Sequence, residues 1–516
     1  MGSTTSLGQL VRAAADIYAH PERVPPATRS KAALQHLSAA GVVRSVLAAH
    51  ADVVPDLPAG PVQTAAGVQT RAEDAVALHA GLAGWLELDD HLLRGRSCAA
   101  TAAAAWAGAT ADHTWDQVLA ATVAGNELSG RLGLATLLGG SEWGHPPGTA
   151  AATALVTGLL AGRDVDALTR SVAHAMSGPV QAVSDRPTTR PLESSDARSA
   201  RRGVASLDAD GDVGLLAGDQ SLLHQWSWRP LPGALAGMGQ VWLTDTLTVR
   251  TRAMAPAGQT AVEAVAEILA RHVKAADKRL RVDQVERIVV RVPAAAAGLG
   301  VPGALEPASV PWSVPNLLGV LVARHALGAA DLAPEVLAAR AADITHVAER
   351  VEWVVDRRLS AQAVVAQLRV LGPLMGDVGW KDARTVLLRL LAGRRRGGPP
   401  SREQLAVWSE LVRSLWAHRG HSTDLSGISV DGWQLHLPVQ VELYTTRGGR
   451  WPERRSLPEG APGADWAATV DGVLARFDAA AGATAAGAGR ALWEADGSVP
   501  ALPQVSALMG VDGPSA

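Results

Sequence analysis

The chain contains 516 residues, of which 47% are hydrophobic and 19% are charged, and its formal net charge is −3. At this length a single hydrophobic core stops growing, so we expect two or more lobes. The balanced charge lacks the basic excess that is typical of nucleic-acid-binding proteins. The single cysteine, Cys98, excludes intrachain disulfides and cysteine-based metal clusters, as is usual in a reducing cytosol.

The N-terminal segment lacks the charged and apolar regions of a secretory signal. No uninterrupted apolar run reaches the roughly 18 residues that indicate a membrane span. We therefore expect a cytoplasmic protein without a membrane or nucleic-acid partner. No lysine lies between Lys31 and Lys274, which excludes an amine base or Schiff base from that stretch.

The first half of the chain, up to residue 247, has helical periodicity almost throughout and little β-branched alternation. This pattern predicts a helical bundle or array. The clearest predicted helices are Leu7–His20, Arg29–Ala51, Ala72–Asp89, Trp115–Leu138 and Gly148–Ala161.

After residue 247 the pattern changes, and alternating strands appear among helices. This mixture predicts a smaller α/β domain over 248–463, with a helical insertion at about 360–430 and a final helix that returns to the helical domain over 464–516. The predicted strands are Arg281–Val292, Val351–Val355 and Trp433–Thr446, and the predicted helices are Gln259–His272, Asn316–Leu327, Ala338–Arg350 and Asp465–Ala480.

Inside the insertion, the basic run Gly393–Pro400 is typical of a solvated loop, and His418 and His421 lie close to it. No carboxylates or cysteines accompany these histidines at ligand spacing, so we expect no metal site.

One candidate for chemistry is His145, in the loop between two small-residue helices that we expect to be buried. An imidazole in such a place can exchange a proton near neutral pH. A loop histidine is also commonly structural or solvated, so the position alone does not decide between these interpretations.

Three polar stretches are further candidates. The segment Trp85–His91 places several ionisable groups after an apolar helix, where burial is costly unless they are paired or used. The Arg-rich segment Ser184–Asp208 could hold carboxylates near a helix N-terminus. The segment Thr248–Ala264 lies where the two lobes join, a usual place for small-molecule sites. The alternatives are, respectively, a helix end that emerges into solvent, a surface loop and a solvated linker.

Taken in order, several stretches resemble the MmgE/PrpD family, which includes 2-methylcitrate dehydratase and cis-aconitate decarboxylase. They are WLELDD, AGNELSGRLG, HPPGTAAATALVTGLLAG, ARRGVAS, QTAVEAVAEIL, VERIVVRV and VELYTTRGGRWPERRSLPEG. The resemblance implies a large helical domain, an α/β lid and an active site between them, usually within a homodimer. It also implies cofactor-independent removal of a proton next to a carboxylate of a small acid, followed by loss of water or CO₂.

Carried over by residue, the resemblance assigns Glu87 and Asp90 to the family's acidic positions and His145 to an active-site histidine. His91 stands where the family usually has threonine. The family's other catalytic histidine is missing, because Arg96–Ala99 occupies that place.

The family's cationic and lid positions correspond to Arg190, Arg202, Arg250, Arg252 and Asn316. Two family lysines are therefore replaced by arginines, which keep the ability to bind carboxylates but do not lose a proton near neutral pH.

We therefore expect a divergent lyase, a dehydratase or decarboxylase, with His145, Glu87, Asp90 and His91 as catalytic residues. Arg190, Arg202, Arg250, Arg252 and Asn316 would bind a small carboxylate substrate, with no metal and no cofactor. Two alternatives remain open: an isomerase or epimerase on the same scaffold, and a binding protein that has lost catalysis.

Overall fold

The computed structural model is mainly helical, with a small sheet region. His145, the basic run 393–400, His418 and His421 lie outside the residues that the structure describes. The described residues are 5–93, 95–137, 148–178, 188, 190–216, 221–227, 229–276, 279–375, 409, 412–413, 416–417, 424–482 and 487–510.

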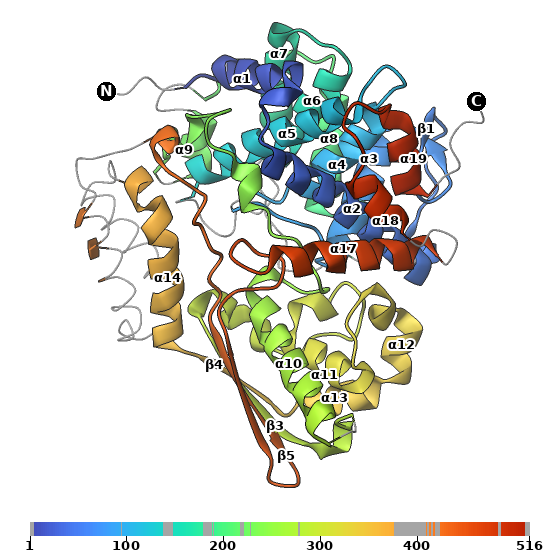
Figure 1. Ribbon diagram of the computed structural model, residues 1–516, viewed down its shortest axis with the longest axis vertical. Helices are drawn as coiled ribbons and strands as arrows, with labels where there is room; N and C mark the ends of the chain where they lie inside the picture. Colours follow the sequence, from blue (N-terminus) through green and yellow to red (C-terminus); the bar gives the residue numbers. More distant parts are fainter. Residues whose placement is uncertain are drawn as a thin grey trace.

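The helical region contains helices α1–α9 and α17–α19, so the described part of the chain begins and ends in this region (Figure 1). Its helices are α1 (Leu7–Ala19), α2 (Pro26–Ala49), α3 (Ala72–Trp85), α4 (Cys98–Gly108), α5 (Trp115–Ala135), α6 (Gly148–Leu160), α7 (Val165–Met176), α8 (Ser195–Ala205), α9 (Leu222–Trp226), α17 (Trp466–Ala481), α18 (Ala488–Trp493) and α19 (Ala501–Met509).

Small residues let these helices approach closely. At Gly125 of α5, an added Cβ would lie 2.6 Å from the side chain of Val156 in α6. At Gly41 of α2, it would lie 3.2 Å from the backbone of Phe477 in α17. Every residue of α6 is buried, as its composition predicts. The last helices therefore pack directly on the first ones, across more than 400 residues of sequence.

The sheet region contains four strands in the order β4–β3–β5–β6, with β3 and β4 parallel and the other pairs antiparallel. The strands are β3 (Val285–Val292), β4 (Val351–Val355), β5 (Val439–Thr445) and β6 (Arg450–Arg455). The helices of this region are α10 (Gln259–Ala276), α11 (Val314–Arg324), α12 (Pro334–Ala339), α13 (Ala341–Ala348) and α14 (Arg357–Leu371). A separate hairpin pairs β1 (Val62–Gln63) with β2 (Gln69–Thr70).

Two hydrophobic cores follow this division only in part. One fills the helical region. The other fills the space beneath the sheet and also includes Leu82, Trp85 and Leu86 at the end of α3. The end of α3 is therefore packed into the junction of the two regions, and the residues that follow it are positioned there.

The helices and strands expected from the sequence are confirmed, with shifted ends. Helix α3 stops at Trp85 rather than Asp89, because Glu87 has a positive φ of 56°. The strand expected from Arg281 begins at Val285, because Val282–Gln284 forms a 3-10 turn. The helix expected over 338–350 is interrupted at Arg340, which ends α12 and precedes α13.

Among the described helices, α2 is long and apolar enough to cross a membrane by length and composition alone. Within the structure, 72% of its most apolar window is buried by the rest of the chain. Its apolar surface is thus already covered by the helices of the core.

Candidate active site

The segment after α3 turns inward at the junction of the two regions. The amide of Glu87 donates to the carbonyl of Gly84 at 3.0 Å, and the left-handed backbone at Glu87 redirects the chain. Glu87, Asp89 and Asp90 are at most 5% exposed. The interpretation of this segment as a helix end that emerges into solvent is therefore wrong.

Arg96 is the counterion for two of these acids. Its Nε donates to Oδ2 of Asp89 at 3.0 Å, and its Nη2 donates to Oδ1 at 2.7 Å, which is a bidentate pair. The same Nη2 lies 3.1 Å from Oε1 of Glu87. Asp196, buried in the first turn of α8, also faces this positive charge.

Arg250 brings the segment between the two regions to the same place. Its Nη2 donates to the carbonyls of Glu87, at 3.1 Å, and of Met254, and its amide donates to Oδ1 of Asp90 at 2.9 Å. Two backbone hydrogen bonds between His91 and Thr248, of 3.1 and 2.8 Å, hold the two segments side by side. The guanidinium is 1% exposed, so this arginine is not solvated on a linker.

Arg476 of α17 completes the group, which we call the acid–arginine cluster. It contains four carboxyls and three guanidiniums: Glu87, Asp89, Asp90, Asp196, Arg96, Arg250 and Arg476.

Several atoms of the acid–arginine cluster are buried without a hydrogen-bond partner. They include Oε2 of Glu87, Oδ2 of Asp90, both Nε and Nη1 of Arg250, and Nε of Arg476. Buried polar groups are almost always paired, so unpaired ones indicate a site for water, a ligand or chemistry. Here the unpaired set contains both proton acceptors and cationic donors.

Burial raises the pKa of three carboxyls in the cluster to about 7. For Glu87, burial and Asp89 act against the lowering effect of Arg96 and Arg250. For Asp90, burial outweighs Arg476 and the hydrogen bonds from Arg250 and Ser38. For Asp196, burial outweighs Arg96. Carboxyls with such values exchange protons near neutral pH, as a general acid or base must.

The predicted substrate-binding residues do not all join this cluster. Arg190 is exposed, before a 3-10 turn. Arg202 lies in the last turn of α8, not at its start, because Ser194 caps α8 eight residues earlier. Asn316 is buried in α11, where its side-chain amide donates to the carbonyl of Gly303 at 2.9 Å. Of the predicted set, the structure brings together Glu87, Asp90, the backbone of His91, and Arg250.

Arg252 belongs to a second polar group at the same junction. Its Nη2 lies 3.6 Å from Glu459, whose amide donates to both oxygens of buried Glu263 at 3.0 Å. Glu263 also accepts hydrogen bonds from Gln259, at 2.8 Å, and contacts Arg455 at 2.9 Å. Burial and Glu459 raise the pKa of Glu263 to about 7, against the effect of Arg455.

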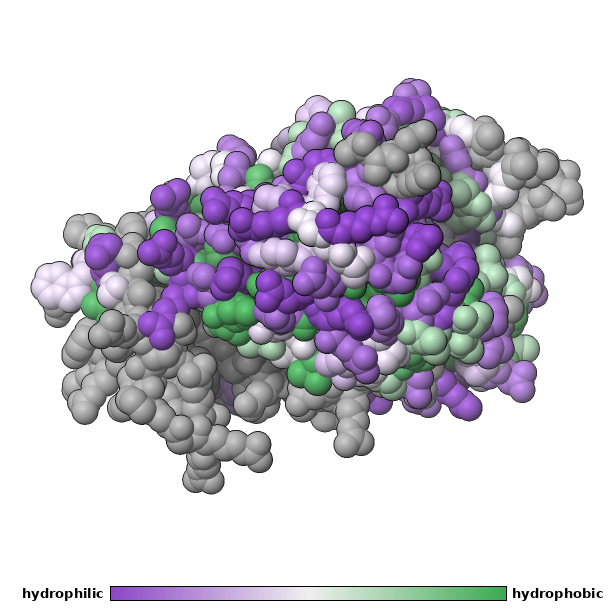
Figure 2. Space-filling model, turned by 90° about the horizontal axis from the view of Figure 1, so that it is seen from below, coloured by the Kyte–Doolittle hydropathy of each residue, from purple (hydrophilic) through white to green (hydrophobic). Residues whose placement is uncertain are grey.

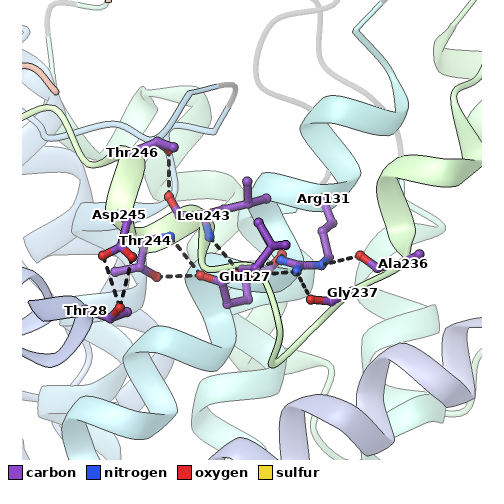
Figure 3. Close-up of polar contacts among 10 residues, drawn as sticks. Thr28, Glu127, Arg131, Ala236, Gly237, Leu243, Thr244, Asp245 and Thr246 are labelled. Atoms are coloured by element: carbon purple, nitrogen blue, oxygen red, sulfur yellow. Dashed lines mark hydrogen bonds and ion pairs between the residues drawn. The ribbon is translucent and has the colours of Figure 1, made fainter. Parts of the chain in front are cut away.

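A third buried group, in α5, has a structural role (Figure 3). Glu127 pairs with Arg131 and accepts hydrogen bonds from the amides of Leu243, at 2.9 Å, and Thr244, at 2.8 Å. Arg131 donates to the carbonyls of Ala236, Gly237 and Val241 at 3.3, 2.8 and 2.8 Å. This pair therefore fastens the loop over 236–246 onto α5.

A surface cavity of about 560 Å³ lies elsewhere, between the segment 279–283, the end of α11, and α13. Two of its arginines, Arg281 and Arg340, pair with the adjacent Asp283 and Asp343. The underside of the molecule, at the end of the sheet region farthest from the helical region, is mostly hydrophilic with small hydrophobic areas (Figure 2). The cavity shares no residue with the acid–arginine cluster.

Among the described residues, no group of three or more His, Cys, Asp or Glu could hold a metal ion. The chain matches no protein-family model, and no curated protein matches it.

Sequence reasoning missed four members of the cluster, and the signals differ. Asp89 and Arg96 lay in stretches already singled out, but their mutual pairing has no local sequence signature. Asp196 carried one signal, since it follows the N-cap Ser194 in a polar stretch. Arg476 carried none, because it lies in an ordinary amphipathic helix.

Proposed function

We propose that this protein is a divergent lyase of the MmgE/PrpD type, a cofactor-independent enzyme of the cytoplasm that removes a proton next to a carboxylate of a small acid. On this proposal residues 1–247 and 464–516 form the helical domain and residues 248–463 form the lid. The observation that carries the proposal is the set of unpaired buried atoms on Glu87, Asp90 and Arg250 at the junction of the two regions.

The unpaired atoms suit the chemistry of such a reaction. The Nε and Nη1 atoms of Arg250 each keep an N–H donor without a partner, so each can donate a hydrogen bond to an oxygen of an acidic substrate. A substrate held there would place its α carbon beside carboxyls whose pKa is about 7. The positive charge of Arg250 would stabilise the negative charge that develops on the substrate carboxylate.

The reaction balances without a co-reactant. The base takes the α proton, the electron pair of the broken C–H bond forms a double bond, and the leaving hydroxide receives a proton and departs as water. Glu87 or Asp90 serves as one proton carrier, and His145 remains the sequence-based prediction for the other. If the α carbon is instead reprotonated on its opposite face, the same groups give an epimerase.

The first test is a thermal-shift screen of the full chain against 2-methylcitrate, citrate, cis-aconitate and shorter dicarboxylates. A ligand at a hundred times its Kd adds about 2.7 kcal/mol of stability, which such a screen detects. Turnover of each hit is then followed by the absorbance of the new double bond. A screen with no hits and no turnover would contradict the proposal.

Variants separate catalysis from binding. Glu87→Gln, Asp90→Asn and His145→Gln should each lower kcat by about 10²–10⁴-fold, because a general acid or base contributes that much. The matched control is Glu263→Gln, which removes a buried carboxyl with the same raised pKa that makes no contact with Glu87 or Asp90. Full activity in all three site variants would exclude these roles.

A binding protein without catalysis is the second candidate, and one observation favours it. Arg96 already occupies Oε1 of Glu87 and both oxygens of Asp89, so the protein neutralises part of its own acidic site. Under this alternative, ligands are stabilising in the screen but are recovered unchanged after prolonged incubation.

We also propose a homodimer, as the family resemblance implies. Sedimentation equilibrium of the full chain tests this, and a mass of one 53.3 kDa chain would contradict it.

A further inference from the structure

One guanidinium at the edge of the acid–arginine cluster holds two groups that contact Asp90. Arg476 donates from Nη2 to Oγ of Ser38 at 2.9 Å, and from Nη1 to the carbonyl of Arg250 at 2.5 Å. Ser38 then donates to Oδ1 of Asp90 at 3.0 Å, and the amide of Arg250 donates to the same oxygen at 2.9 Å. Helices α2 and α17 and the segment between the two regions therefore meet around a single carboxyl.

This arrangement makes the two oxygens of Asp90 unequal. Oδ1 accepts two hydrogen bonds, whereas Oδ2 is buried without a partner. A carboxyl protonates on the oxygen whose lone pairs are not already engaged by donors. The proton of Asp90 therefore resides on Oδ2.

The charged groups that face Asp90 come from every element packed around it. Arg476 and the backbone amide of Arg250 favour its charged form, and Asp89 opposes it. Cys98, at the start of α4, also faces it, and burial together with Asp90 raises the pKa of the thiol well above its usual value. Cys98 therefore stays neutral, and Arg476 is the main positive charge acting on Asp90.

We propose that Arg476 is a positioning residue for Asp90: by holding Ser38 and the backbone of Arg250 it saturates Oδ1, so that Asp90 binds and releases its proton at Oδ2 alone. The inference rests on the proposed function in one respect only: it takes the substrate to be the molecule with which Asp90 exchanges its proton. The control of the proton affinity of Asp90 is a property of the free protein and is measured without a substrate.

The experiment uses the full-length chain, its variants Arg476→Gln, Ser38→Ala and Arg44→Gln, and the Asp90→Asn variant of each of these four proteins. Urea unfolding is measured between pH 5 and 9, with and without Asp90→Asn in each background. The difference isolates the titration of Asp90. Loss of the Arg476 cation should move its midpoint upward by about one pH unit or more, because a nearby opposite charge contributes shifts of that size.

Ser38→Ala removes one hydrogen bond to the charged form and should move the midpoint in the same direction by a smaller amount. Arg44→Gln is the matched control, since Arg44 lies between the same two helices, 5.4 Å from the ring centroid of Phe477, and should leave the midpoint unchanged. Infrared spectroscopy gives a second readout: the band of the protonated Asp90 carboxyl is the one that is absent from Asp90→Asn. In Arg476→Gln this band should persist to higher pH than in the unmodified protein.

A uniform loss of stability at every pH, with an unchanged midpoint in Arg476→Gln, would show a merely structural residue and overturn the inference. If Arg476→Gln does not fold, an unchanged midpoint in Ser38→Ala overturns it equally. The two proposals fail separately: a shifted midpoint without turnover on any acid rejects the lyase alone. Turnover with an unshifted midpoint rejects the positioning role alone.

Discussion

Two of the buried arginine–carboxylate groups among the described residues, the pair in α5 and the acid–arginine cluster at the junction of the two regions, differ in how fully their polar atoms are paired. Glu127 and Arg131 of α5 bond to each other and to the backbone and a threonine side chain of the loop they hold. In the acid–arginine cluster, by contrast, Glu87, Asp90 and Arg250 keep atoms without partners. The comparison teaches that burial of charge alone does not distinguish the two groups, whereas unused bonding capacity does, and this is what makes the cluster the candidate site.

The largest loss of unfolding free energy is expected at Glu127 and Arg131, whose polar atoms are all paired. Glu127→Ala leaves Arg131 buried without its counterion and should cost about 3–5 kcal/mol of unfolding free energy, as breaking buried ion pairs does. Urea unfolding at pH 7 measures this. A cost below about 1 kcal/mol would mean that water reaches Arg131 and that the group is not sealed.

The incompletely paired cluster should give the protein an unusual pH dependence. The pKa values of Glu87, Asp90 and Asp196 are about 7 in the folded state and near 4 when unfolded, so the native state binds more protons between these values. Unfolding free energy should therefore fall as pH rises from about 4 to 7 and then level off, because the coupled carboxyls of the native state keep protons that the unfolded state has lost.

Glu87→Gln should make the unfolding free energy fall less steeply with pH, because one of the three titrating carboxyls is gone. Urea unfolding curves at pH 5, 6, 7 and 8 would measure this. Arg163→Ala, a surface change, should leave the slope unaltered. Stability that rises with pH over this range would mean that the carboxyls are charged in the native protein.

The two arginines should tolerate lysine differently. Arg131→Lys loses contacts to several carbonyls at once and should cost about 2–3 kcal/mol, at about 1 kcal/mol per hydrogen bond. Arg250 uses only Nη2 of its side chain, so Arg250→Lys should cost about 1 kcal/mol or less. Equal costs in urea unfolding would mean that Arg250 is paired as completely as Arg131.

The smallest effect is expected at the surface. The exposed pair of Arg163 with Asp208 should contribute at most about 1 kcal/mol, so Arg163→Ala should hardly change the unfolding midpoint. A loss of unfolding free energy above about 1 kcal/mol would mean that burial does not determine how much each of these ion pairs contributes to stability.

The sequence was sufficient for most of the helices and the central strands, because their periodicity reflects local burial. It also singled out Glu87 and Asp90, as ionisable residues after an apolar helix, and Arg250, as a cationic residue where the two lobes were expected to join. The left-handed backbone at Glu87 was not predictable, because no glycine or asparagine marks it.

The place of Arg476 in the cluster could not be predicted from the sequence, for a different reason. Its contacts are separated by 226 residues from Arg250 and by 438 from Ser38, and such pairings follow from the packing of α17 on α2. The end of α8 at which Arg202 lies was not predictable, because the start of α8 depends on the cap Ser194, which is one of several serines in that stretch.

The return of α17 to α2 also sets an order of events during synthesis. Ser38, Asp90 and Arg96 leave the ribosome early, whereas Arg476 follows only after the whole sheet region has been made. Chains fold from their N-terminal parts first, so α2 and the segment after α3 must wait for a late partner. The face of α2 on which α17 packs is therefore exposed until the final helices have been made.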